Sequence, residues 1–513
     1  MAKVEEPTID VKLFVDKAKG KVLCAESDKE FVDVLFSFLT MPLGTIVRLM
    51  DKQSQMGCLH ELCKSVEDLS TDYFQTKACK AMLLAPLNAA SNHCSQLKIN
   101  VDDPKRWTAV YACKNRNCCA QGDIAFSLVP DIVCKCGSVM QDYGERPAME
   151  LNLGSSSTAS DGSEDGVFVK RCFKFIITDD LQVAPASTSL LLSLFQKFEV
   201  REPADIEQKI VRFDSDKITS LIKRALTSQH ALSGHYFKVP VTRGDANLDT
   251  LPPKLDEQVN EDEHKIDSVK IRLFQTKSSS SLLYAEVGGD FVDLLFGLLS
   301  VPVGSIMKIF GQWPSKGCLG NLYNSTDGSA SACMRPECQS LLLAPKSAPF
   351  FGCSATRILN IDELVPRSLK IDACSTCLKL RGFANLRQCR AKCLYTGAAM
   401  CSIPQKCTEL RGLNPKSPAV GSKDGEDAAY VKAGHMKFMV TDDLGVLLLS
   451  LSTALQIVSE AKIQTEELVE QEIIVTTLQI AEIHRAALMG RHALSSVLIP
   501  PKKAKKLLNH VVY

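Results

Sequence analysis

The sequence has almost no net charge, because its 60 lysine and arginine residues are balanced by 59 aspartate and glutamate residues. A chain without an overall positive field has no general attraction for nucleic acid or for an anionic membrane surface. One local excess is the lysine-rich stretch at 501–513, which is typical of a solvated basic tail. The composition therefore argues against nucleic acid as the main partner.

The sequence also lacks a long apolar run. No segment reaches the roughly 18 uncharged apolar residues that a membrane-spanning helix needs. The nearest one, 444–458, contains Ser and Gln and predicts a buried helix. The first residues, MAKVEEPTIDVK, contain no apolar core of the length found in signal peptides. We therefore expect an intracellular protein, in the cytoplasm or the nucleus, that has no membrane partner.

Sequence patterns of the common catalytic sites are missing as well. The chain contains no Walker loop, no GxGxxG, no GxSxG and no HExxH. These are the patterns of nucleotide sites, serine hydrolases and zinc proteases. We therefore expect a protein that is not an enzyme, and we identify no small-molecule substrate.

A long internal repeat is the strongest positive feature of the sequence. The stretch from Val22 to Val47 returns from Leu282 to Lys308. Half of the 22 positions from Ala25 to Ile46 are identical at an offset of 260 without a gap. The match continues as Gly-Cys-Leu at 57–59 and at 317–319. Identity of this density and length indicates a tandem duplication.

Each copy begins with a hairpin that leads into a helix. In the first copy, two apolar runs flank a turn at Gly20, and Ser27 with Glu30 has the spacing of a capping box at a helix start. The helix that follows has an apolar face at helical spacing and is expected to end before Pro42. We expect this hairpin with its packed helix to be the structural nucleus of each copy.

The duplication predicts two α+β domains, each a mixed or antiparallel sheet covered by helices and carrying a cysteine-rich knuckle. Two segments rich in Ser, Gly and Asp cannot bury apolar surface, and we expect them to be exposed loops that divide each domain into two lobes. The first domain is 8–240, with front lobe 8–153, exposed loop 154–166 and back lobe 167–240. The second is 268–500, with front lobe 268–411, exposed loop 412–427 and back lobe 428–500. An acidic linker, 241–267, joins them, and 501–513 is the basic tail.

The strongest chemical signal is a cluster of cysteines in the first copy. Two closely spaced pairs separated by a loop can supply four thiolates to a tetrahedral zinc ion. The candidate ligands are Cys113, Cys118, Cys134 and Cys136, with Cys119 as an alternative to Cys118. Their spacings of four and one residues differ from the two that zinc knuckles usually have. The other interpretation is a set of partly buried thiols.

The second copy has its own group of cysteines at the corresponding place. The candidate zinc ligands there are Cys374, Cys377, Cys389 and Cys393, with Cys401 and Cys407 as further possibilities. Twenty-one cysteines in a chain with no secretory signal point to reduced thiols and metal binding, not to a disulfide framework. We therefore expect structural zinc as the cofactor. No histidine or carboxylate joins either cluster, so no open catalytic zinc site is predicted.

Paired carboxylates stand at the end of a predicted strand in both copies. The Asp-Asp pairs at 179–180 and 442–443 lie where acid–base or metal chemistry often occurs. Adjacent acidic residues also suit a turn and the start of the next helix, which is the interpretation we favour. His230 and His492 both begin the sequence His-Ala-Leu-Ser and follow a predicted helix, where a cation complements the helix dipole.

Several of these motifs together resemble a family of plant proteins. They are VKLFVDKAKGKVLCAE, FVDVLFSFLTMPLGTIVRL, the GCLxxL segment, CKAMLLAP, the CxxxxC…CxCG cluster and FIITDDLQVAPASTSLLLSLFQKF. Over nearly its whole length, and in both copies, the chain is similar to the plant proteins grouped as domain of unknown function family 674. The resemblance implies a plant protein with a duplicated repeat and no established activity. The family's second cysteine pair reads Cys-Pro-x-Cys-Gly, whereas this chain has one residue fewer, Cys134-Lys-Cys136-Gly137.

From these observations we predict a non-enzymatic protein-interaction module with structural zinc, in which two similar domains offer related surfaces to a protein partner. Two other functions stay open. One is a hydrolase or transferase that uses the Asp-Asp strand ends, which a pocket lined by these carboxylates would favour. The other is nucleic-acid binding through the cysteine knuckle, where Lys114 and Arg116 supply local positive charge.

Overall fold

The structure is a computed structural model of the chain. The residues it describes are 6–50, 56–102, 109–113, 125–145, 165–171, 174–200, 202–239, 268–277, 281–311, 317–365, 369–374, 380–381, 405–417 and 429–499.

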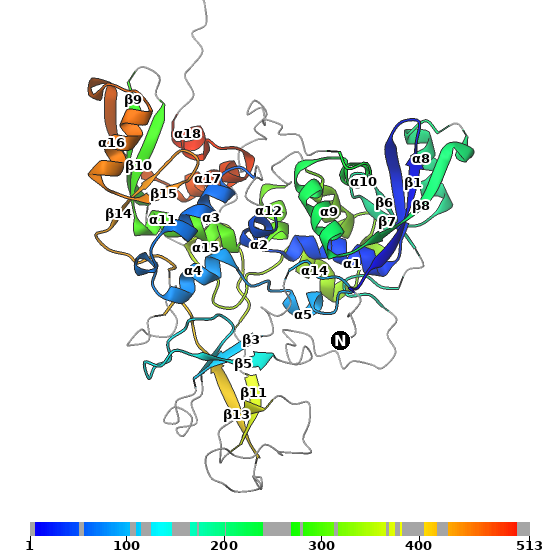
Figure 1. The fold of residues 1–513 in the computed structure, drawn as a ribbon, viewed down its shortest axis with the longest axis horizontal. Coiled ribbons are helices and arrows are strands. Elements are labelled where there is room, and N and C mark those ends of the chain that lie inside the picture. Colours follow the sequence, from blue (N-terminus) through cyan, green and yellow to red (C-terminus); the bar gives the residue numbers. More distant parts are fainter. Residues whose placement is uncertain are drawn as a thin grey trace, which may run out of the picture.

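Two five-stranded antiparallel sheets lie at opposite ends of the molecule's long axis (Figure 1). The strands of the first are β1 (Ile9–Asp16), β2 (Lys21–Ser27), β6 (Phe175–Thr178), β7 (Val183–Pro185) and β8 (Ile206–Phe213). Those of the second are β9 (Val269–Thr276), β10 (Leu282–Gly288), β14 (Lys437–Val440), β15 (Val446–Leu448) and β16 (Leu468–Val475). The orders, β7-β6-β2-β1-β8 and β15-β14-β10-β9-β16, correspond strand for strand. Together with the helices, these sheets confirm the α+β class.

The helices follow in the same sequence in both halves of the chain. In the first half they are α1 (Lys29–Ser37), α2 (Leu43–Leu49), α3 (Leu59–Asp68), α4 (Lys77–Leu84), α5 (Ser91–Cys94), α8 (Thr188–Lys197), α9 (Ser215–Thr227) and α10 (Ala231–Tyr236). In the second half they are α11 (Gly289–Gly297), α12 (Val303–Phe310), α13 (Leu319–Asp327), α14 (Pro336–Leu343), α15 (Ser354–Ile358), α16 (Leu451–Glu460), α17 (Thr477–Met489) and α18 (Ala493–Leu498). No helix in the described part of the chain has the length and apolar character to cross a membrane.

The predicted hairpin and helix are present, with one correction at the helix start. The β1–β2 pair leads into α1, whose side chains Phe31, Leu35 and Phe36 and their neighbours are buried. The N-cap is Asp28, whose side chain accepts a hydrogen bond from the Glu30 amide, and not the predicted Ser27. Ser27 is still paired in β2, opposite Phe175, so the strand continues one residue further than the capping pattern suggested.

The two halves meet along short segments that precede α2 and α12. Pro42 and Pro302 face each other in an antiparallel bridge. The Leu43 amide donates to the Val301 carbonyl at 2.9 Å, and the Val303 amide donates to the Met41 carbonyl at the same distance. These reciprocal bonds relate the halves by an approximate twofold axis, which passes between the two prolines.

Each half also places helices on the sheet of the other. The Ser65 hydroxyl on α3 accepts the Val446 amide of the second sheet at 2.8 Å, and the Ser325 hydroxyl on α13 accepts the Val183 amide of the first at 3.0 Å. In Figure 1 the first-half helix α3 accordingly lies beside α11 and α17, with which it shares contacts or hydrogen bonds. One continuous apolar core therefore contains residues of both halves.

A third sheet combines strands from the two halves and lies to one side of both five-stranded sheets (Figure 1). Its strands are β3 (Ala109–Ala112), β4 (Ala125–Ser127), β5 (Gln141–Glu145), β11 (Leu369–Cys374), β12 (Leu380–Arg381) and β13 (Gln405–Gly412). Their order is β12-β11-β13-β4-β3-β5, and the halves are joined where β13 runs parallel to β4, with Arg411 opposite Ala125. The cysteine cluster of the first half borders this sheet.

A histidine occupies the core position on α17 that Ile222 occupies on α9. His484 is fully buried, and its Nε2 lies 2.9 Å from the Leu294 carbonyl oxygen, while Nδ1 has no hydrogen-bond partner. Nε2 must donate this bond, because a carbonyl oxygen only accepts. Burial lowers the pKa of His484 to about 4. The imidazole is therefore neutral in the folded protein at physiological pH.

We expect the variant His484→Ile to lose less stability on acidification than the unchanged protein. An unfolded histidine titrates near pH 6.5, so the folded state binds fewer protons, and stability is lost as the pH falls from about 6.5 towards 4. At pH 5 this loss is about 2 kcal/mol. Urea unfolding at pH 7 and pH 5 measures it. The matched control Ile222→Val should leave the pH dependence unchanged, and equal pH dependence in His484→Ile would contradict the assignment.

Candidate metal centre

A tight turn after β4 positions two of the predicted cysteine ligands. The Cys134 amide donates to the Ser138 carbonyl at 2.9 Å, and the Gly137 amide donates back to the Cys134 carbonyl at 2.8 Å. Gly137 has a φ of +82°, a left-handed conformation that glycine adopts without steric cost. The turn thus holds Cys134 and Cys136 on one short loop, next to the end of β3.

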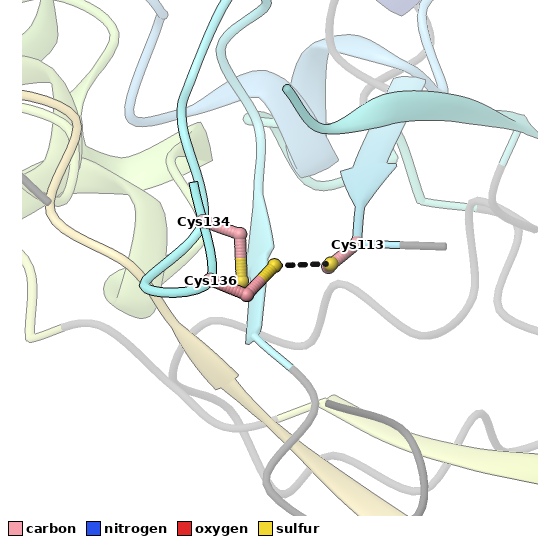
Figure 2. A group of neighbouring side chains, drawn as sticks. All are labelled: Cys113, Cys134 and Cys136. Carbon is pink, nitrogen blue, oxygen red and sulfur yellow. Dashed lines mark hydrogen bonds between the residues drawn. The ribbon is translucent and has the colours of Figure 1, made fainter. Parts of the chain in front are cut away.

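Three cysteine sulfurs converge at this turn. The Sγ atoms of Cys113, Cys134 and Cys136 all lie within 4.8 Å of one another. Figure 2 shows Cys113 reaching the turn from the end of the neighbouring strand, with its sulfur facing that of Cys136 at 3.5 Å. Cys113 and Cys134 are buried and belong to the apolar core, whereas Cys136 is exposed. The cluster therefore has an apolar inner side and one sulfur at the surface.

The geometry suits a thiophilic metal. Zinc bound by thiolates has Zn–S distances near 2.3 Å and tetrahedral angles, which place neighbouring sulfurs about 3.8 Å apart. In the cluster, the sulfurs of Cys113 and Cys136 are 3.5 Å apart, and all three sulfurs lie within 4.8 Å of one another. Soft thiolate ligands also favour Cu(I) and exclude hard cations such as Mg²⁺ and Ca²⁺. The three sulfurs can thus hold a metal ion, and their chemistry leaves its identity open.

The structure brings together three of the four ligands predicted for the first copy, and the one-residue spacing between Cys134 and Cys136 does not prevent convergence. The fourth, Cys118, and its alternative Cys119 lie outside the described residues. In the second copy the backbone of Cys374 ends β11, and the side chain lies outside the described part. The other second-copy candidates, Cys377, Cys389, Cys393 and Cys401, fall outside it too, and Cys407 is described only by its backbone in β13. The second zinc site stays a prediction.

Strand pairing relates Cys113 in the first copy to Cys374 in the second. Both β3 and β11 lead into an Ala-Cys pair, and each alanine has a partner on the next strand. The pairs are Ala112 with Gln141 and Ala373 with Lys406.

One member of the first Asp-Asp pair, Asp179, caps a helix. Asp179 is buried, and its Oδ1 accepts the Ser233 amide at 2.7 Å, in the first turn of α10. Its Oδ2 accepts the Ser233 hydroxyl and lies 2.9 Å from His230 Nδ1. Sequence reasoning singled out the aspartate and the histidine separately and placed His230 after a helix. The structure places it at the N-cap of α10, joined to the aspartate.

The second copy repeats this arrangement. Asp442 Oδ1 accepts the Ser495 amide at 2.8 Å, while Oδ2 accepts the Ser495 hydroxyl at 2.7 Å and lies 2.9 Å from His492 Nδ1. Sequence reasoning missed the two serines, although the recurring His-Ala-Leu-Ser was the signal for them. A nucleophilic serine needs a histidine to take its proton. Here each hydroxyl donates to the aspartate, so the groups are arranged for capping and not for serine activation.

Comparison with known proteins gives one match. The family model described as "Protein of unknown function (DUF674)" matches residues 5–509. No curated protein shows a significant match to the chain, and no solved structure does. The match covers both halves and the cysteine cluster between β3 and β5.

Proposed function

The chain belongs to the DUF674 family, whose description names no activity, and from its own residues we propose that it is a non-enzymatic protein-interaction module with a structural zinc ion. The observation that carries this proposal is the convergence of the sulfurs of Cys113, Cys134 and Cys136 within 4.8 Å. Two of them are buried, as the ligands of a structural site usually are, and no histidine or carboxylate belongs to the group that would mark a catalytic zinc.

A metal ion bound by these cysteines would stabilise the third sheet. The cluster joins the end of β3 to the turn that leads into β5, and β3 pairs with β5 on one side and with β4 on the other. The third sheet then continues into the second half through β4 and β13. A zinc ion that fastens the turn would therefore stabilise the sheet that both halves share, since binding energy at a structural site becomes folding energy. Reduced thiols of this kind fit an intracellular protein, in the cytoplasm or the nucleus.

The interaction part of the proposal draws on the surface of the second half. Leu451 and Leu455 lie one turn apart on α16 and are 85% and 69% exposed. Exposed leucines in a row are typical of a surface that a protein partner covers. The matched helix α8 has Thr188 and Leu192 at these positions, so the two halves offer related but different surfaces. Affinity purification with the intact chain tests this part, and recovery of no reproducible partner would contradict it.

Metal analysis tests the metal part. We expect the purified protein, made without a metal-chelating tag, to contain zinc, and Cys134→Ser to contain one zinc ion fewer per chain. The replacement removes a buried thiolate and leaves two of the three sulfurs. The control Cys333→Ser changes a half-buried cysteine outside the cluster and should keep the full metal content. Equal zinc content in Cys134→Ser and the unchanged protein would contradict the site.

A further inference from the structure

We propose that Cys113 and Cys136 form a disulfide when a peroxide oxidises the exposed Cys136, and that this bond and the metal ion compete for the same sulfurs. The competition rests on the proposed zinc site, whereas the disulfide requires only the two thiols.

The two sulfurs are already in contact. Cys113 Sγ and Cys136 Sγ are 3.5 Å apart, and a disulfide shortens this separation to about 2.05 Å. The residues come from different elements, the end of β3 and the turn after β4, so the bond closes a loop instead of linking neighbours in sequence. Cys136 is exposed on a turn whose next residue is Gly137, where even an added Cβ would meet no other atom within 4 Å. To form the bond, the two sulfurs must approach each other by about 1.5 Å.

Exposure distinguishes Cys136 from nearly all other cysteines whose side chains are described. Apart from the half-buried Cys333, the others are buried. Burial raises the pKa of several of them, including Cys24, Cys63 and Cys94, to about 12. The thiolate is the form that attacks peroxide, and the peroxide must be able to reach it from solvent. Oxidation is therefore expected to begin at Cys136 and not in the core.

The chemistry proceeds in two balanced steps. The Cys136 thiolate attacks one oxygen of hydrogen peroxide, the O–O bond breaks, and hydroxide leaves, giving a sulfenic acid. The Cys113 sulfur then attacks the Cys136 sulfur, the S–O bond breaks, and the hydroxyl leaves as water with the thiol proton. Each disulfide thus consumes one peroxide, which is reduced, while the two thiols are oxidised.

Oxidation replaces the metal ion by a disulfide as the link between β3 and the turn. The disulfide removes two of the three convergent thiolates, and Cys134 alone cannot retain the metal. The new covalent bond still ties the end of β3 to the turn, so the edge of the shared sheet stays closed. The site would then release zinc under oxidising conditions without losing its local structure, and a thiol reductant would restore the thiolates.

Peptide mapping by mass spectrometry under non-reducing conditions tests the disulfide. After treatment with one equivalent of hydrogen peroxide, protein stripped of metal by a chelator should yield a cross-linked peptide pair containing Cys113 and Cys136. Cys134→Ser should still form it, Cys136→Ser should not, and the control Cys333→Ser should behave like the unchanged protein. A disulfide from Cys136 to Cys118, Cys119 or Cys134, or oxidation of Cys136 that stops at sulfinic acid, would overturn the assignment.

A zinc-sensitive dye tests the competition in the metal-loaded protein. We expect one zinc ion released for each Cys113–Cys136 disulfide, and slower oxidation than in the stripped protein because the metal holds the thiolates. Disulfide formation with zinc retained would overturn the competition. Protein that never contains zinc but forms the disulfide would contradict the proposed zinc site while supporting the oxidation. The failure of one proposal is thus distinguishable from the failure of the other.

Discussion

Replacement of Gly57 by alanine is expected to lower the free energy of unfolding by on the order of 3 kcal/mol or more. Gly57 has a φ of +53°, and a Cβ there would lie 2.1 Å from the carbonyl oxygen of Ala487 in the other half. The next amide, that of Cys58, donates to the same carbonyl at 2.7 Å, so the backbone cannot retreat without breaking this bond. Urea unfolding monitored by circular dichroism measures the loss.

Substitutions at two other glycines distinguish the two causes of this stability loss, which are backbone strain at positive φ and the steric contact between the halves. Gly20 has a φ of +59° but open space around it, so Gly20→Ala measures backbone strain alone, about 1 kcal/mol. Gly317 is the counterpart of Gly57, and a Cβ there would lie 2.4 Å from the carbonyl oxygens of Ala225 and Leu226. Gly317→Ala therefore measures the contact between the halves without positive-φ strain. A loss at Gly57 no larger than at Gly20 would mean that this contact is unimportant.

Replacement of Asp33 by alanine is the second change with a large expected effect. The buried carboxylate accepts the amides of Val167, Phe168 and Val169 at 2.6, 2.8 and 3.1 Å. Each orphaned buried donor costs about 1–3 kcal/mol. We therefore expect a loss of roughly 3 kcal/mol or more in urea unfolding, enough to endanger folding. A loss below that of an ordinary surface substitution would contradict the role of this carboxylate.

The asparagine variants give a matched comparison. At the equivalent position, Asp293 accepts two amides, those of Tyr430 and Val431, and both at Oδ1. The single side-chain oxygen of an asparagine at 293 can accept both of these amides. At Asp33 the Val167 amide uses the second oxygen, Oδ2, where asparagine would present a donor to a donor. Asp33→Asn should therefore cost about 1–3 kcal/mol more than Asp293→Asn.

The comparison is best made above pH 7. Burial raises the pKa of Asp33 and of Asp293 to about 6, against the opposing effect of their amide bonds. The folded state then binds a proton more readily than the unfolded state, so these groups reduce stability as the pH rises from about 4 to 6. Above pH 7 both carboxylates are ionised. The difference in stability loss between Asp33→Asn and Asp293→Asn then depends on how many amides each carboxylate oxygen accepts. Equal costs for the two asparagine variants would contradict the bonding described.

Local patterns in the sequence predicted the local structure of each half. The β1–β2 hairpin and α1, which ends at Ser37 before Pro42, follow from residue periodicity and from turn and breaker residues, which act over a few positions. The helix start was misplaced by one residue because Asp28, not Ser27, caps α1. The choice between adjacent capping residues depends on where the strand stops pairing, and that depends on β6, far away in the sequence.

Contacts between the halves could not be predicted in this way. The bonds from Ser65 to Val446 and from Ser325 to Val183 join residues that no periodicity relates. The same holds for the candidate site. Spacing identified Cys113, Cys134 and Cys136 as a group, but their convergence depends on the turn at Gly137 and on the pairing of β3 with β5. Sequence alone could not show that Asp179 and Ser233 meet, because α10 follows long after β6.

The reciprocal packing of the halves suggests how such a chain arises in evolution. A polypeptide with one copy of the repeat would have helix α3 without the sheet that it contacts here, and a sheet without that helix. Two such polypeptides, related by a twofold axis beside Pro42, would complete each other as an intertwined homodimer. Joining their genes end to end gives the arrangement seen here. The joined subunits can then diverge, as Leu451 on α16 and His484 have done, without either losing its partner.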